Sequence, residues 1–92
     1  MLKGRLCIKE QEESGTYQFT GVPIYMTCGF QSIFENVAQE IISTALAQIL
    51  EKYPGNADYL QVFTYHREDG EVIKFWCIND VDHITFLLPE EY

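Results

Sequence analysis

Basic residues are scarce in this sequence. Six Lys and Arg stand against fourteen Asp and Glu, so the 92-residue chain has a formal net charge of −8. Non-specific binding to nucleic acid gains its affinity from neutralised phosphates, and anionic membrane surfaces attract proteins in the same way. The one basic cluster, Lys3, Arg5 and Lys9, is thin. We therefore expect no direct nucleic-acid partner and no membrane partner, because an acidic surface favours a basic protein instead.

Cysteine is also rare. Cys7, Cys28 and Cys77 are odd in number and lack CxxC spacing, which is typical of free thiols in a reducing compartment rather than of a disulfide framework. The residues after Met1 do not resemble a signal peptide, and no apolar run is long enough to cross a bilayer. We expect a cytoplasmic protein.

Recognisable catalytic motifs are missing as well, including Gly-rich phosphate loops and zinc-protease helices. Cys28 precedes a predicted helix, but a nucleophile needs a base, and nothing in the sequence places His66 or His83 near it. The loop Asp80–His83 combines carboxylates with an imidazole, as a cation site would, although turns favour Asp and Asn for backbone reasons alone. We expect no enzymatic activity, no cofactor and no metal. A small enzyme using Cys28 or the Asp80–His83 loop is the remaining alternative.

Apolar residues are plentiful: 47% of the chain is hydrophobic and 14% aromatic, which predicts one globular domain over residues 1–92. The clearest element is an amphipathic helix, which we expect to begin at a Ser32–Glu35 capping box and to end near Tyr53, before Pro54-Gly55. Its apolar positions recur at helical spacing. They are Phe34, Val37, Ala38, Ile41, Ile42, Ala45, Leu46, Ile49, Leu50 and Tyr53.

The outer face of this predicted helix is small and uncharged in its middle. The residues concerned are Ser43, Thr44, Ala47 and Gln48. They are either a homodimer seam or a solvated helix surface.

Three short strands are expected before the helix, at Arg5–Lys9, Thr16–Thr20 and Ile24–Cys28, with a polar surface loop between the first two. The same stretch is equally compatible with one hairpin and a loop. After the helix, Tyr59–His66 and Val72–Ile78 form an expected hairpin.

We expect Asp69-Gly70 to make a two-residue type I′ turn in this hairpin, so that Phe63 faces Trp76 and Tyr65 faces Lys74. Ile84–Leu88 is a final buried strand. The predicted fold is α+β: a mainly antiparallel sheet of about four to five strands packed against one long amphipathic helix.

Two motifs in the last third resemble a known family. They are Asp58–Phe63 (DYLQVF) and the closing stretch Asp80–Tyr92, which contains DVDHIT and LLPEEY. Together with the preceding helix, they make residues 24–92 resemble the bacterial domain of unknown function 960 family. The resemblance implies a small cytosolic α+β domain of Gram-positive bacteria, their phages and mobile elements, and it implies no activity or catalytic residue. Thr64–Lys74 is shorter than the family pattern, and nothing before Gly21 corresponds to it.

The leading hypothesis is a non-enzymatic inhibitor, of the anti-CRISPR kind, that presents an acidic surface to a basic, nucleic-acid-handling host protein. It depends on the charge, the small size and the phage context that the resemblance implies. The candidate partner-binding residues are Glu68, Asp69, Glu71, Asp80, Asp82, Glu90 and Glu91.

The alternative is an oligomeric sponge that sequesters a nucleotide-like signalling molecule. Its bases would stack on aromatic side chains of the sheet, namely Tyr59, Tyr65 and Trp76, with Tyr17 beside them. Lys3, Arg5 or Lys74 would hold the phosphates.

Overall fold

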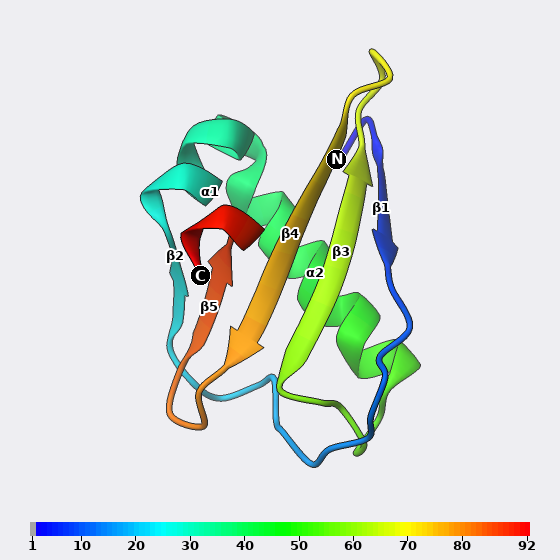
Figure 1. Cartoon of the computed structure of the whole chain (residues 1–92), viewed down its shortest axis with the longest axis vertical. Coiled ribbons are helices and arrows are strands. Elements are labelled where there is room, and N and C mark those ends of the chain that lie inside the picture. Colours follow the sequence, from blue (N-terminus) through cyan, green and yellow to red (C-terminus); the bar gives the residue numbers. More distant parts are fainter. Residues whose placement is uncertain (1) are drawn as a thin grey trace.

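The computed structural model describes residues 2–92 and shows a five-stranded sheet with a helical layer on one face (Figure 1). The strand order is β1-β3-β4-β5-β2, and only β2 and β5 run parallel. The predicted α+β fold is confirmed. Its elements are β1 (Arg5–Ile8), β2 (Ile24–Met26), α1 (Cys28–Phe34), the 3-10 turn η1 (Glu35–Val37), α2 (Ala38–Lys52), β3 (Leu60–His66), β4 (Val72–Asn79), β5 (Ile84–Leu87) and the 3-10 turn η2 (Pro89–Glu91).

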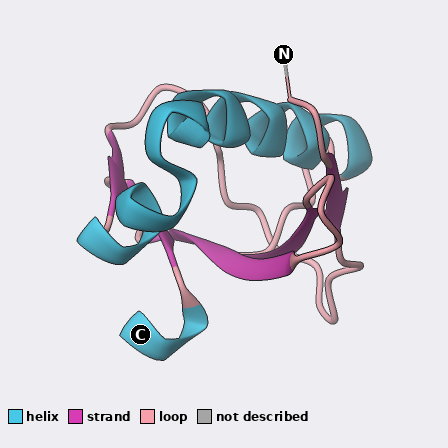
Figure 2. Cartoon of the chain, turned by 90° about the horizontal axis from the view of Figure 1, so that it is seen from above, coloured by secondary structure: helices cyan, strands magenta, loops and turns pink. Residues whose placement is uncertain are grey.

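The helical segment begins earlier than the sequence predicts and is interrupted. Thr27 is the N-cap of α1, because its hydroxyl oxygen accepts a hydrogen bond from the Phe30 N–H at 3.2 Å. The capping box predicted at Ser32 is wrong, since Glu35 adopts a φ of 49° and ends α1 instead. The chain then turns through η1 into α2, which lies across the sheet (Figure 2).

The N-terminal strands differ from the prediction in one element. Thr16–Thr20 is a loop and not a strand: the Tyr17 N–H donates to the Ala57 carbonyl at 3.1 Å, and Phe19 is buried in the core. The other two strands form as β1 and the short β2. They lie at opposite edges of the sheet.

The β3–β4 hairpin is one residue out of the predicted register. Arg67 and Glu71 pair through their backbones around a three-residue loop, and Gly70 has a φ of 94°, as in a type I turn with a glycine bulge. Phe63 therefore faces Phe75 rather than Trp76. A slip of one residue moves a side chain to the other face of a sheet, so Trp76 points away from the helices.

The core lies between α2 and the sheet and is rich in phenylalanine. Phe63 and Phe75 stack with ring centroids 5.1 Å apart, and Phe30 meets Phe75 edge-on at 5.3 Å. From α2, Ile41 and Ile49 are fully buried against these rings. Leu50, which was predicted to be part of the apolar stripe, is exposed.

Candidate functional site

The predicted acidic residues do not form one surface. They fall into three groups: the β3–β4 turn, the β4–β5 turn and the C-terminal turn η2. β4 runs between the first two groups, and its eight residues span about 25 Å at about 3.3 Å per residue. These turns lie at opposite ends of the molecule (Figure 1). A single partner surface cannot be assembled from all seven residues.

The β3–β4 turn uses its charges internally. The Arg67 guanidinium donates to the Ile33 carbonyl at 2.6 Å and to the Glu71 carboxylate at 3.2 Å. The Asp69 carboxylate accepts from the Glu71 N–H at 2.9 Å. These contacts fix the turn and tie it to the end of α1.

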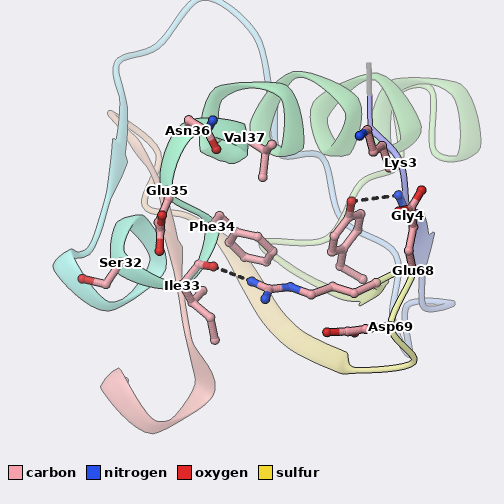
Figure 3. A pocket seen from close by; sticks show the side chains of 12 residues that line it. Lys3, Gly4, Ser32, Ile33, Phe34, Glu35, Asn36, Val37, Glu68 and Asp69 are labelled. Carbon is pink, nitrogen blue, oxygen red and sulfur yellow. Dashed lines mark hydrogen bonds between the residues drawn. The ribbon is translucent and has the colours of Figure 1, made fainter.

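A hollow of about 630 Å³ lies beside this tether, between the turn and the helix break (Figure 3). Glu68 and Asp69 line it from the turn, Glu35 from the break, and Lys3 from the N-terminal side. Its wall thus mixes both signs of charge, and its guanidinium already has acceptors. The hollow offers no consistent chemistry to a ligand.

The C-terminal group is divided. Glu90 is exposed, whereas the Glu91 carboxylate accepts from the Thr27 hydroxyl at 2.5 Å, the Leu88 N–H at 2.9 Å and the Gly29 N–H at 3.1 Å. The hydrogen bond from Thr27, followed by that from Leu88, lowers the pKa of Glu91. Glu91 fastens η2 to the start of α1, so we assign it a structural role.

The β4–β5 turn is the most unusual of the three. Val81 stands at its tip with a φ of 75° and 76% of its surface exposed. A β-branched residue rarely adopts a positive φ, and such strain is typically retained at functional sites. Asp80 and Asp82 flank it, and their carboxylates face the two ring nitrogens of His83 at 3.3 and 2.7 Å.

The turn holds its shape through Asn79. The Asn79 side-chain oxygen accepts from the Val81 N–H at 2.7 Å, and its side-chain nitrogen donates to the Gln18 carbonyl at 2.6 Å. The Asn79 N–H donates to the Tyr59 carbonyl at 2.8 Å. These bonds bring two separate segments, around Tyr17 and Tyr59, beside the turn.

We call this region the acidic tip. It consists of Tyr17, Asp58, Tyr59, Asp80, Val81 and Asp82. The rings of Tyr17 and Tyr59 lie 6.0 Å apart, and both are partly exposed. The acidic tip contains three carboxylates, those of Asp58, Asp80 and Asp82, and within residues 2–92 no Lys or Arg forms an ion pair with any of them. The tip therefore combines negative charge with exposed apolar side chains.

No group of three or more His, Cys, Asp and Glu within residues 2–92 is arranged to hold a metal ion. In the Asp80–His83 loop, the two carboxylates lie on opposite sides of the imidazole and do not converge on a common point.

The predicted aromatic platform is wrong. Tyr65 is buried on the helix side, where its hydroxyl accepts from the Gly4 N–H at 3.0 Å and its ring meets Phe34. Trp76 lies on the opposite side of the sheet, against Tyr92 at 5.7 Å. Tyr59 precedes β3 at the acidic tip. The sheet alternation separates these rings, so they cannot form one stacking surface.

The other candidates are distributed over the fold. Cys28 is exposed at the start of α1, and Cys77 is buried, which raises the pKa of its thiol. On the outer face of α2, Ser43 and Ala47 are exposed and Thr44 is half-buried. Gln48 donates to the Leu6 carbonyl of β1 at 3.0 Å, so it belongs to the fold rather than to a free seam.

The sequence reasoning missed Val81 as part of this site, and it grouped Tyr17 with Tyr59 only as members of a stacking surface for a ligand. Val81 could have been noticed in the sequence, because turns favour small and polar residues and a β-branched apolar residue inside the turn Asn79–His83 is therefore unusual. The contact of Tyr17 with Tyr59 had no local signal, since it depends on the loop before β2.

Comparisons with protein-family models, curated proteins and solved structures give no match. The resemblance to the domain of unknown function 960 family stays a prediction. Of the helices in residues 2–92, none combines the length and the apolar character needed to span a bilayer.

Proposed function

We propose that this protein is a non-enzymatic binding protein whose acidic tip docks on a basic surface of a partner protein. In its most specific form, the proposal is an inhibitor that covers the nucleic-acid-binding surface of that partner. The observation that carries it is Val81, an exposed and strained valine between two aspartates.

Energetics support this reading. A strained backbone conformation of this kind costs about 1–3 kcal/mol, and a solvated turn gains nothing in return. Binding hot spots combine an apolar anchor with surrounding charges that steer and orient the partner. Val81, with Tyr17 and Tyr59 beside it, supplies the anchor, and Asp58, Asp80 and Asp82, none of which forms an ion pair with a Lys or Arg of residues 2–92, supply the charge.

The order of the turn also favours binding. Asn79 bonds to Val81 within the turn and to two separate segments at Gln18 and Tyr59, so the tip is held in one conformation before a partner arrives. A preformed surface loses less conformational freedom on association than a mobile loop does.

The test is affinity capture from a bacterial lysate with the wild type and two matched variants. Asp80→Asn/Asp82→Asn removes two carboxylates from the tip, and Glu68→Gln/Glu90→Gln removes two elsewhere. We expect a basic, nucleic-acid-binding protein to be captured by the wild type and the second variant but lost with the first and with Val81→Gly. Equal capture by all four proteins would contradict the proposal.

The inhibitory form has its own readout. The captured partner, once purified, should lose nucleic-acid binding as wild-type protein is added, and Val81→Gly should compete at least about tenfold less well. A partner that binds nucleic acid and this protein together would exclude inhibition while leaving the docking role intact.

A further inference from the structure

One face of the sheet has no helical cover. α1 and α2 occupy one side, and only the short turn η2 lies on the other (Figure 2). We call this second side the open face. None of the five strands contains an Asp or Glu, although the chain has fourteen of them. No acidic side chain therefore projects from the strands themselves, and negative charge borders the open face only through the adjoining loop and η2.

Its side chains form rows across the strands. In the middle, Val62, Trp76 and Leu87 are paired across β3, β4 and β5. Leu60 and Ile78 form the next row towards the acidic tip. This centre is apolar: Ile78 and Leu87 are buried, Leu60, Val62 and Trp76 are half-buried, and the exposed Tyr92, which follows η2, packs on Trp76.

The far end of the open face is basic. Arg5 of β1 pairs with His66 of β3, and Lys74 of β4 pairs with Thr64 one row nearer the centre. Arg5 and Lys74 are exposed, and neither has an ion-pair partner within residues 2–92. At about 3.3 Å per residue, Arg5 lies about 20 Å along the strands from the row of Leu60.

The near end is acidic. A hollow of about 350 Å³ is lined by Leu60 and Val62 on the sheet side and by Lys9, Glu10, Glu12 and Glu13 on the loop side, with Asp58 and Tyr59 beside them. Four carboxylates against one lysine leave it net acidic. The three glutamates are exposed or border this hollow, and none forms an ion pair with a Lys or Arg of the described chain.

This acidic loop is held in place. The Gln11 N–H donates to the Tyr53 hydroxyl at 2.8 Å, and the Gln11 side-chain oxygen accepts from the Asp58 N–H at 2.9 Å and the Gln61 side chain at 2.8 Å. The Lys9 N–H donates to the Val62 carbonyl at 2.8 Å. The open face thus has fixed ends of opposite charge on either side of an apolar centre.

From this pattern we propose that the open face binds a second copy of the chain, giving a two-fold symmetric dimer. The two-fold axis runs parallel to the sheet and perpendicular to its strands. The strands of one copy therefore run opposite to those of the other, and the basic end of each open face meets the acidic end of the other. Val62 and the Trp76–Tyr92 pair then meet their counterparts, and Arg5 and Lys74 of each copy face the acidic loop of its partner.

The charges select this occupant and this axis. An isologous interface requires one surface to be complementary to itself, and a face that is basic at one end and acidic at the other meets that condition only when inverted. An axis along the strands would set the basic end of one copy against the basic end of the other, and the acidic end against the acidic end. The inference does not rest on the role of the acidic tip. Asp58 and Tyr59 border the hollow at the acidic end, but Asp80, Val81 and Asp82, which the tip variants change, lie beyond the row of Leu60 and Ile78.

The experiment is a charge swap followed by measurement of mass in solution. One variant carries Arg5→Glu/Lys74→Glu, and the other carries Glu12→Lys/Glu13→Lys. Wild type should sediment as a dimer that dissociates as NaCl rises from about 0.05 to about 1 M. Each variant alone should dimerise at least about 100-fold more weakly, because like charges then meet across the interface.

Mixing the two variants gives the decisive result. In the mixed pair, opposite charges meet at both ends, so a heterodimer should form when neither variant dimerises alone. Native mass spectrometry distinguishes it by mass. The matched control, Ser43→Glu/Ala47→Glu on the outer face of α2, should leave the wild-type dimer unchanged, and circular dichroism checks that every variant is folded.

Several results would overturn the proposal. They are a wild type that stays monomeric at millimolar concentration, a dimer that is insensitive to both charge reversals, and two monomeric variants that fail to associate when mixed. A monomer whose open face instead binds poly-glutamate or a single-stranded oligonucleotide would replace the second copy with another occupant. Tip variants such as Asp80→Asn should leave the dimer intact, so failure here is distinguishable from failure of the proposed function.

Discussion

Arg67 and Ile33, 34 positions apart in the chain, meet through a hydrogen bond of 2.6 Å from the guanidinium to the backbone carbonyl. The carbonyl belongs to the last turn of α1, where the break at Glu35 leaves it without the usual partner within a continuing helix. Arg67 replaces that partner and joins the β3–β4 turn to the helical layer.

Replacing Arg67 with Ala should therefore lower the free energy of unfolding by about 1–2 kcal/mol, as expected for a partly exposed, charge-assisted hydrogen bond. Urea denaturation measures this difference. Arg5→Ala, which removes an exposed arginine that has no ion-pair partner among residues 2–92, should change stability by less than about 0.5 kcal/mol. Equal effects of the two substitutions would argue against the tether.

Glu91→Gln should weaken the fold in a pH-dependent way. Hydrogen bonds from Thr27, Leu88 and Gly29 lower the pKa of Glu91 in the folded state below its usual value of 4.5. A depressed carboxyl pKa stabilises the fold above the unfolded value, and this contribution is lost as the pH falls through the folded pKa. The stability difference between wild type and Glu91→Gln should be full at pH 7 and should shrink below about pH 4.5.

Thermal unfolding from pH 7 down to about pH 3 follows this difference. Glu90→Gln is the matched control, because Glu90 is the exposed neighbour in the same turn. A pH-independent gap between wild type and Glu91→Gln would show that the carboxylate charge is not what stabilises the contact.

Val81→Gly should stabilise the protein, in contrast to most substitutions of an apolar residue by glycine. Glycine adopts a φ of 75° without a steric penalty, and relief of the strain should exceed the entropy that glycine adds to the unfolded chain, for a net gain of about 1 kcal/mol. Differential scanning calorimetry measures it. Val72→Gly, at another exposed valine but within β4, should destabilise the protein by about 0.5–1 kcal/mol.

The sequence predicted the helices and strands of the fold better than the register in which the strands pair. The apolar stripe on the helix and the alternation in β3 and β4 are local patterns, so the helix, the central hairpin and the α+β class could be read directly. The hairpin register depended on the loop geometry, and Asp69-Gly70 suits both a two-residue turn and a three-residue loop with a glycine bulge. Because of that single ambiguity, the prediction placed Trp76 on the same face of the sheet as Phe63, whereas it lies on the opposite face.

The candidate site was less predictable, for a physical reason. Acidic residues favour turns whether or not they bind a partner, so composition could not separate Glu91, which anchors η2, from Asp80 and Asp82, which remain at the surface. The acidic tip joins the segments around residues 17, 59 and 81 through hydrogen bonds of Asn79. Such long-range contacts leave no periodic pattern in the sequence.

The pairing of β2 with β5 bears on when the chain can fold during its synthesis. Ile24 lies beside Ile84, so this edge of the sheet closes a loop of 60 residues, and Glu91 must then reach back to cap α1. Pairing over such a separation carries a large loop-closure entropy and forms late. A ribosome-bound chain that ends before β5 can build the β3–β4 hairpin but cannot complete the sheet, so the native fold waits until β5 and η2 have left the ribosome.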